Sequence, residues 1–188
     1  MDALIPAFIA AALAEMGDKS PWLAAMLAAR YGRPGAVVLG VIVAAILAST
    51  LSAIAGALVQ PMIEGNARLL FLALALLLSG ITGFLALKRP DPLANWRIGA
   101  FATSAIGLFI LQFGEGTQFL VMGLAANARI PALAAVGATL GIVAVTVPMA
   151  LAGLALRDRM PLRLMRIGPA CLFLLAGLIA AVNALGLV

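Results

Sequence analysis

The chain has 188 residues, of which 65% are hydrophobic and only 10% are charged, and its mean hydropathy is +1.19. This composition excludes a soluble globular domain, because a domain of this length could not bury so much apolar surface. The formal net charge of +5 does not indicate nucleic-acid binding, since the basic residues gather in alternate loops between apolar segments. The sequence predicts an all-α integral membrane protein.

Proline, glycine and charged clusters divide the chain into six apolar segments. A membrane-spanning helix needs roughly 20 mostly apolar residues, and each segment reaches about that length. The expected transmembrane helices are 4–29, 35–59, 67–87, 98–126, 131–156 and 162–187.

The first span carries charged residues near its centre, in the run Glu15-Met16-Gly17-Asp18-Lys19-Ser20. An ionisable side chain at that depth costs several kcal/mol, so it indicates a functional site that faces the helix bundle. In a continuous helix, the i,i+3 spacing would place Glu15 and Asp18 on one face. An ion pair between Glu15 and Lys19 is the purely structural alternative, and it leaves Asp18 unexplained.

Pro21 follows this run directly. Proline has no amide hydrogen and clashes with the carbonyl four residues earlier, here that of Gly17. We therefore expect Pro21 to kink the first span and to free a backbone oxygen beside the acids.

The second span has a small residue at every fourth position, which favours close helix packing within the bundle. These residues are Ala36, Gly40, Ala44, Ala48, Ser52 and Gly56.

The fourth span carries a second polar run, Gln112-Phe113-Gly114-Glu115-Gly116-Thr117, followed by Gln118. Glu115 is the third acid expected at bilayer depth. The other acids of the chain fall in predicted loops or helix ends: Asp2, Glu64, Asp91 and Asp158.

The two polar runs are part of an internal repeat with an offset of 97 residues (114 − 17 = 97). The offset superposes five glycine or proline pairs: Gly17/Gly114, Pro34/Pro131, Gly40/Gly137, Gly56/Gly153 and Gly80/Gly177. Each unit has three spans, so the second unit must be inverted relative to the first. We expect a single membrane domain made of repeats 1–90 and 98–188, with a cytoplasmic linker at 88–97.

Basic residues predict the orientation. Two of them, Arg68 and Arg129, lie in the loops on one side of the membrane. The loops after spans 1, 3 and 5 carry nine: Arg30, Arg33, Lys88, Arg89, Arg97, Arg157, Arg159, Arg163 and Arg166. By the positive-inside rule these three loops are cytoplasmic, which puts both termini outside the cytoplasm of a cell (inner) membrane.

Inverted repeats would bring the two polar runs together near the middle of the bilayer. The expected ligands of a metal ion there are Glu15, Asp18, Ser20, Gln112, Glu115, Thr117 and Gln118, with Gly17, Pro21 and Gly114 breaking the helices and Lys19 as an intramembrane base. Oxygen ligands favour Mn²⁺, Ca²⁺ or Mg²⁺ over Zn²⁺ or Cu⁺. A metal ion must displace protons from such carboxylates, which is the basis of cation/proton exchange.

The first run matches the motif E-x-G-D-[KR]-[ST] in full, and on it the sequence resembles the Gdt-type cation/proton antiporters. That family carries two copies of the motif and includes Golgi manganese/calcium transporters and bacterial manganese exporters. The resemblance covers essentially the whole chain. It implies a secondary transporter that exchanges Mn²⁺ or Ca²⁺ for protons and exports the ion from the cytoplasm, with no cofactor and no enzymatic activity.

The second run departs from the family motif. Gln112 stands in the place of a glutamate, Glu115 in that of an aspartate, and Gly116 in that of a lysine or arginine, while Gly114 and Thr117 match. The run therefore lacks one acid and one base, so the sequence leaves open the proton stoichiometry, the choice of ion and whether this motif still supports transport.

Three other functions share part of this pattern. A small six-span exporter of a basic amino acid or another organic cation could also use an acidic pocket, and a non-transporting membrane partner protein needs no ion site. An intramembrane aspartyl protease needs a second intramembrane aspartate beside Asp18, and none is expected. The oligomeric state stays open.

Overall fold

A computed structural model describes residues 2–113, 115–153 and 162–187. Within these ranges the secondary structure is helical, with a short 3₁₀ turn at Gln60–Met62 after the third helix. The helices are α1 (Leu4–Glu15), α2 (Lys19–Tyr31), α3 (Pro34–Val59), α4 (Gly65–Phe84), α5 (Ala100–Phe113), α6 (Gly116–Asn127), α7 (Pro131–Ala152) and α9 (Leu162–Ala184).

Prolines and glycines mark several helix boundaries. Pro34 and Pro131 begin α3 and α7, where a residue without an amide hydrogen loses no helical hydrogen bond. Gly32 ends α2 in the left-handed conformation, with φ of 60°. The second, third, fifth and sixth predicted spans correspond to α3, α4, α7 and α9, except that residues 154–156 at the end of the fifth lie outside the described part.

The first and fourth predicted spans are not continuous helices. Each consists of two helices, α1 with α2 and α5 with α6, and the break falls at the polar run. The axes of α5 and α6 differ by 68°. Both breaks therefore occur where the sequence puts charge at bilayer depth.

Several helices can cross a membrane, so the chain is a multi-pass membrane protein. Among the described residues, four helical stretches are long and apolar enough by themselves: Pro34–Met62, Gly65–Phe84, Pro131–Ala152 and Arg163–Ala184. The bent pair α5 and α6 makes a fifth if it forms one span. At 12 residues, α1 is about 18 Å long and too short to cross alone.

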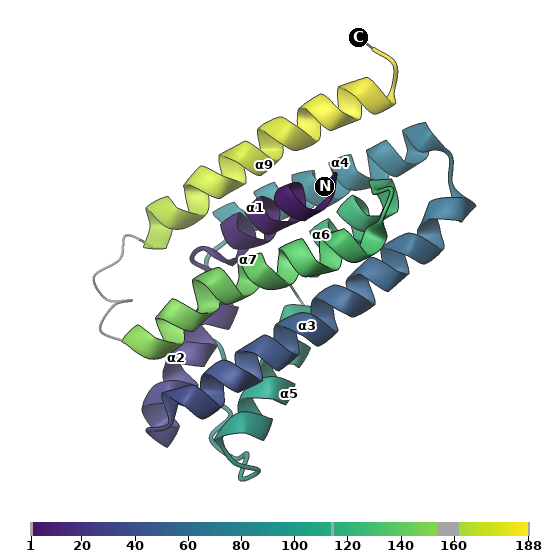
Figure 1. Cartoon of the computed structure of the whole chain (residues 1–188). Helices are drawn as coiled ribbons and strands as arrows, with labels where there is room; N and C mark the ends of the chain where they lie inside the picture. The colour runs from purple at the N-terminus through teal and green to yellow at the C-terminus, as the bar shows by residue number, and fades with distance from the viewer. Residues whose placement is uncertain (1, 114, 154–161, 188) are drawn as a thin grey trace.

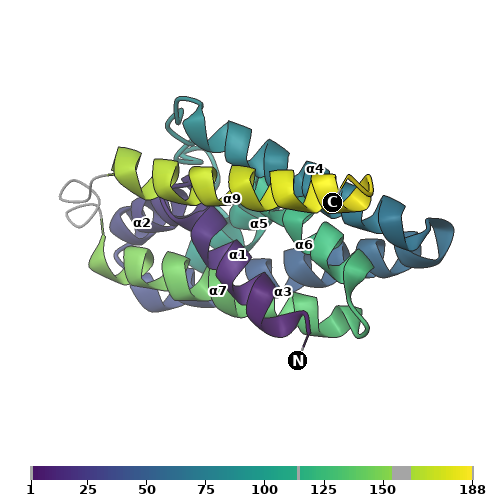
Figure 2. The ribbon, with the colours of Figure 1, turned by 90° about the horizontal axis from the view of Figure 1, so that it is seen from above.

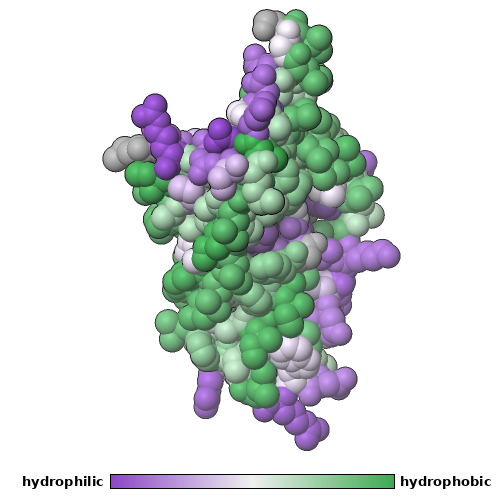
Figure 3. Space-filling view, turned by 90° about the vertical axis from the view of Figure 1, so that its right-hand side faces the viewer, coloured by the Kyte–Doolittle hydropathy of each residue, from purple (hydrophilic) through white to green (hydrophobic). Residues whose placement is uncertain are grey.

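The surface fits a lipid environment. Large apolar side chains such as Leu39, Leu58 and Leu175 are more than half exposed along the helices. In Figure 3 most of one face is apolar, and polar groups gather toward its two ends and along one edge.

The helices run largely alongside one another, with α4 and α9 paired along one side (Figures 1 and 2). Glycines set the closest approaches. An added Cβ atom at Gly40 would meet the α5 backbone near Phe101, and one at Gly137 would meet the Leu4 carbonyl on α1. Gly80 and Gly177 likewise lie against Leu174 and Leu77 in the α4–α9 pair.

These contacts repeat with the 97-residue offset. Helix α1 packs on α7 as α5 packs on α3, and α2 packs on α7 as α6 packs on α3. Three pairs of helices also begin 97 residues apart, at Lys19 and Gly116, Pro34 and Pro131, and Gly65 and Leu162. One contact is not repeated. Helix α4 packs on α6, but the corresponding helices of the other half, α9 and α2, make no comparable contact among the described residues.

We predict that Gly137→Ala lowers the free energy of unfolding of the detergent-solubilised protein by about 1–3 kcal/mol, and with it the melting temperature. The reason is that the new methyl group meets the Leu4 carbonyl. Gly168→Ala in α9 is the control, since a Cβ atom there meets nothing within 4 Å. Equal melting temperatures for the two variants would contradict the tight α1–α7 contact.

Candidate functional site

The first polar run forms a turn between α1 and α2. Helix α1 ends at Glu15 and α2 begins at Lys19, while Gly17 adopts a left-handed conformation with φ of 79° that favours glycine. The backbone N–H of Asp18 donates to the Glu15 carbonyl at 3.1 Å. The Asp18 carboxylate caps α2 by accepting the Lys19 N–H at 2.8 Å.

The second polar run makes a similar turn between α5 and α6. The Glu115 N–H donates to the Gln112 carbonyl at 3.2 Å, as Asp18 does to Glu15 in the first run. Glu115 directly precedes α6, as Asp18 directly precedes α2. Each break thus sets one acid at the N-terminus of a helix, where the helix dipole favours negative charge. Gly114 lies outside the described residues.

The prediction that Pro21 kinks a continuous helix is wrong. The helix has already ended at Glu15, and Pro21 lies in the first turn of α2, where the missing N–H breaks no hydrogen bond. Helix α6 has Gln118 at the same place, and that span is broken too.

The prediction that the residues of each run share one helix face is also wrong, because a break separates them. Glu15 is completely buried, whereas Asp18 is only partly buried. Gln112 is likewise completely buried and Glu115 only partly so.

The two polar runs nevertheless meet, as the repeat predicts. The Ser20 hydroxyl of α2 donates to a carboxylate oxygen of Glu115 at 2.8 Å, across 95 residues of sequence. The charges of Glu15, Asp18 and Glu115 also act on one another, so the three acids lie in one neighbourhood.

Several buried polar atoms in this neighbourhood have no hydrogen-bond partner among the described residues. A buried polar group without a partner costs about 1–3 kcal/mol, so a group of them needs an explanation such as a bound ion or water. These atoms are Glu15 Oε1, both side-chain atoms of the Gln112 amide, Glu115 Oε1, Thr117 Oγ1, Gln118 Nε2, Ser49 Oγ and Ser79 Oγ.

The amide oxygen of Gln118 is already occupied. It accepts a hydrogen bond from the Ser52 hydroxyl of α3 at 2.9 Å, in a fully buried contact. Gln118 is therefore turned toward α3 in this conformation, and it does not line the cavity beside Asp18 and Glu115.

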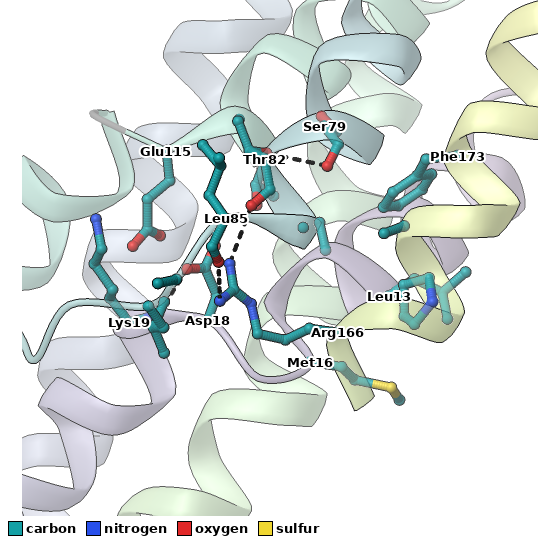
Figure 4. Close-up of a pocket in the computed structure, with 18 of the residues that line it drawn as sticks. Leu13, Met16, Asp18, Lys19, Ser79, Thr82, Leu85, Glu115, Arg166 and Phe173 are labelled. Atoms are coloured by element: carbon teal, nitrogen blue, oxygen red, sulfur yellow. Dashed lines mark hydrogen bonds between the residues drawn. The ribbon is translucent and has the colours of Figure 1, made fainter. Parts of the chain in front are cut away.

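A cavity of about 270 Å³ reaches the two helix breaks (Figure 4). Its lining residues include Asp18, Lys19, Glu115 and Thr117, and they do not include Glu15 or Gln112. Its walls come from α1, α4 and α9, and its lining includes residues 85–88, directly after the end of α4.

In the part of the chain that the structure describes, no three His, Cys, Asp or Glu side chains lie close enough to hold a metal ion together. The three carboxylates among the predicted ligands thus do not form one preformed metal site. Asp18 and Glu115 line the cavity, and Glu15 is completely buried.

Sequence reasoning missed four polar residues of this region. Thr146 of α7 donates to Glu15 at 3.5 Å, and both side chains are completely buried. Ser49 of α3 lies at the same place in the other repeat (146 − 49 = 97), so the repeat offset could have revealed this pair. Ser79 and Arg166 line the cavity, and no local pattern in the sequence marks them.

Comparisons with known proteins agree with this picture of a duplicated chain. The family model described as divalent cation/proton antiporter GDT1 matches residues 3–90 and again residues 100–187. A protein of Vibrio cholerae serotype O1, named as a candidate manganese exporter, is 32% identical over 186 residues, which covers 96% of this chain and 91% of that protein. No solved structure matches.

The geometry of the first break predicts unequal effects of two alanine substitutions. Gly17→Ala should lower stability by about 1–2 kcal/mol, because it forces a side chain into the left-handed region. Pro21→Ala should cost only about 0.5–1 kcal/mol, since Pro21 does not cause the break. Thermal unfolding of both variants in detergent measures this, and a larger loss for Pro21→Ala would contradict the assignment of the break to Gly17.

Proposed function

This chain belongs to the GDT1 family of divalent cation/proton antiporters, and on that premise we propose that it exports Mn²⁺ from the cytoplasm in exchange for protons. The observation that carries the proposal is the hydrogen bond between Ser20 and Glu115, which joins the two polar runs beside a cavity. The name of the Vibrio cholerae relative supports manganese as the exported ion.

The proposed architecture has six spans in two inverted repeats. In this arrangement α1 with α2 forms the first span and α5 with α6 forms the fourth. Two matches of the family model displaced by 97 residues support it, as does the exchange of packing partners between the halves. The repeats comprise residues 1–90 and 98–188, with the linker at 88–97.

The proposed ion site lies at the two helix breaks. Asp18 and Glu115 bind the cation from the cavity, because both carboxylates line it. Ser20 and Thr117 can add hydroxyl oxygens, because Ser20 bonds to Glu115 and Thr117 lines the cavity. Glu15 and Gln112 are completely buried and do not line the cavity. Completing the coordination would require Glu15 to approach the other two acids, which makes binding dependent on conformation.

The chemistry of these groups supports exchange with protons. Carboxylate, amide and hydroxyl oxygens are the ligands that Mn²⁺ and Ca²⁺ accept. A carboxylate that binds a metal ion cannot hold a proton at the same time, so the two ligands compete. Loading the site on one side of the membrane with metal and on the other with protons then gives antiport.

The proposed orientation places the cavity on the cytoplasmic side of an inner membrane, with both termini outside. The cavity lining includes Lys88 and Arg166, which belong to the set of nine basic residues in alternate loops. The structure would then represent a conformation that is open toward the cytoplasm.

We predict that the purified protein in proteoliposomes takes up Mn²⁺ when a pH gradient is imposed, and that Asp18→Asn reduces uptake to the level of empty liposomes. The asparagine keeps the shape of the side chain but removes the charge that binds the cation. Glu64→Gln is the matched control, because Glu64 is an exposed acid at the start of α4, away from the cavity.

Three results would contradict parts of this proposal. Wild-type liposomes without Mn²⁺ or Ca²⁺ uptake would contradict the cation transport, and uptake of a basic amino acid in their place would indicate an organic-cation exporter. Undiminished uptake by a folded Asp18→Asn protein would contradict the site.

A further prediction concerns Gln112, which can offer an oxygen to a metal ion but cannot carry a proton. The site carries a formal charge of −2 when its three acids and its one base are all ionised, namely Glu15, Asp18, Glu115 and Lys19. An ionised glutamate in Gln112→Glu makes this charge −3. We expect Gln112→Glu to strengthen Mn²⁺ binding at high pH by about 1 kcal/mol and to steepen its pH dependence, because one more proton competes.

Titration of Mn²⁺ against wild type and Gln112→Glu from acidic to alkaline pH measures both effects. Glu64→Gln is the control, because it changes an exposed acid that does not line the cavity. Coinciding curves for wild type and Gln112→Glu would mean that Gln112 does not face the ion.

A further inference from the structure

Arg166 joins α9 to the end of α4 at the wall of the cavity. Its guanidinium donates to the Leu85 carbonyl at 2.8 Å and to the Thr82 carbonyl at 3.1 Å. Both carbonyls belong to the C-terminal end of α4, where a positive charge is favourable, and that of Thr82 also accepts the Leu85 N–H at 3.1 Å. Arg166 itself lies in the second turn of α9.

The guanidinium also faces the proposed ion site. Arg166 lines the same cavity as Asp18 and Glu115, and its charge acts on the Asp18 carboxylate. Figure 4 shows Arg166 between the end of α4 and Asp18. Its fixed position beside Leu85 therefore keeps a positive charge at the place where a cation must arrive.

The described lining of the cavity is not negative. Among the described residues, its charged groups are Asp18 and Glu115 against Lys19, Lys88 and Arg166, so three positive and two negative groups leave a formal charge of +1. A divalent cation that reaches Asp18 must therefore overcome repulsion from basic residues already in place.

This arrangement occurs in only one of the two halves. The residue that corresponds to Arg166 under the 97-residue offset is Leu69 of α4 (166 − 97 = 69). The α4–α9 pair packs along its length through Gly80 and Gly177, which carry no charge. Packing of these helices therefore does not by itself explain an arginine at the cavity.

We infer that Arg166 is a positioning residue of the antiporter. Its guanidinium acts as a tethered counter-charge for Asp18, and an arriving divalent cation must displace this guanidinium. This inference rests on the proposed function. By competing with the cargo, the guanidinium weakens cation binding in the cytoplasm-open conformation, where the cation is loaded. Its bonds to Thr82 and Leu85 keep it within reach of Asp18 when the cation leaves.

The test is Mn²⁺ binding and uptake by Arg166→Gln in detergent and in proteoliposomes. We expect binding to become about fivefold tighter, because one repelling charge is removed. The substrate concentration at half-maximal uptake should fall as well. A purely structural role would instead weaken binding.

Two further variants serve as controls. Arg166→Lys keeps the charge but not the pair of carbonyl bonds, so its affinity should stay near that of wild type. Arg163→Gln removes an exposed charge one turn away that does not line the cavity, and it should leave affinity unchanged. Arg166→Met, which keeps much of the side-chain length, replaces Arg166→Gln if the latter does not fold.

The outcomes separate this inference from the function on which it rests. Absence of Mn²⁺ binding and uptake in the wild-type protein contradicts the proposed function before any variant is compared. The role of Arg166 is overturned if the wild type transports Mn²⁺ and a folded uncharged variant binds Mn²⁺ no more tightly than the wild type does.

Discussion

The cost of placing carboxylates among apolar helices governs this structure. A continuous helix at bilayer depth would satisfy its own backbone and leave its acidic side chains without polar neighbours. Ending one helix and starting another places Asp18 and Glu115 at helix N-termini, where the dipole favours negative charge. Asp18 also accepts the Lys19 N–H, and Glu115 accepts the Ser20 hydroxyl instead. The short turns, the buried hydroxyls and the cavity all lie around these two breaks.

The sequence predicts much of this fold because its signals are local. Span lengths, the prolines at the starts of α3 and α7, and the place of the polar runs can all be read from neighbouring residues. The exact form of the break could not, since proline and glycine both disrupt helices and only the backbone shows that Gly17 makes the turn. Arg166 and Ser79 were missed because their roles depend on how α4 and α9 pack, which no short pattern records. The six spans and the inversion of the repeats remain predictions.

The two halves share a plan but not all of their chemistry. Glycine contacts and helix starts recur at one offset, whereas Glu15 corresponds to Gln112, Lys19 to Gly116 and Arg166 to Leu69. Each difference changes the charge of the site. A duplicated backbone can thus keep its packing while the charges of its two copies diverge, because the packing depends on small residues and not on the ionised ones.

The depth of the cavity has an electrical consequence. Where water reaches into a membrane protein, the membrane potential falls across the remaining low-dielectric part, and moving two elementary charges through a full 100 mV is worth about 4.6 kcal/mol. In the proposed orientation, an ion entering the cavity would reach Asp18 and Glu115 before crossing most of that potential. The voltage would therefore act mainly on the step that carries the ion past the completely buried Glu15 and Gln112. In such a protein the membrane potential would act on the conformational change and leave cytoplasmic binding almost independent of voltage.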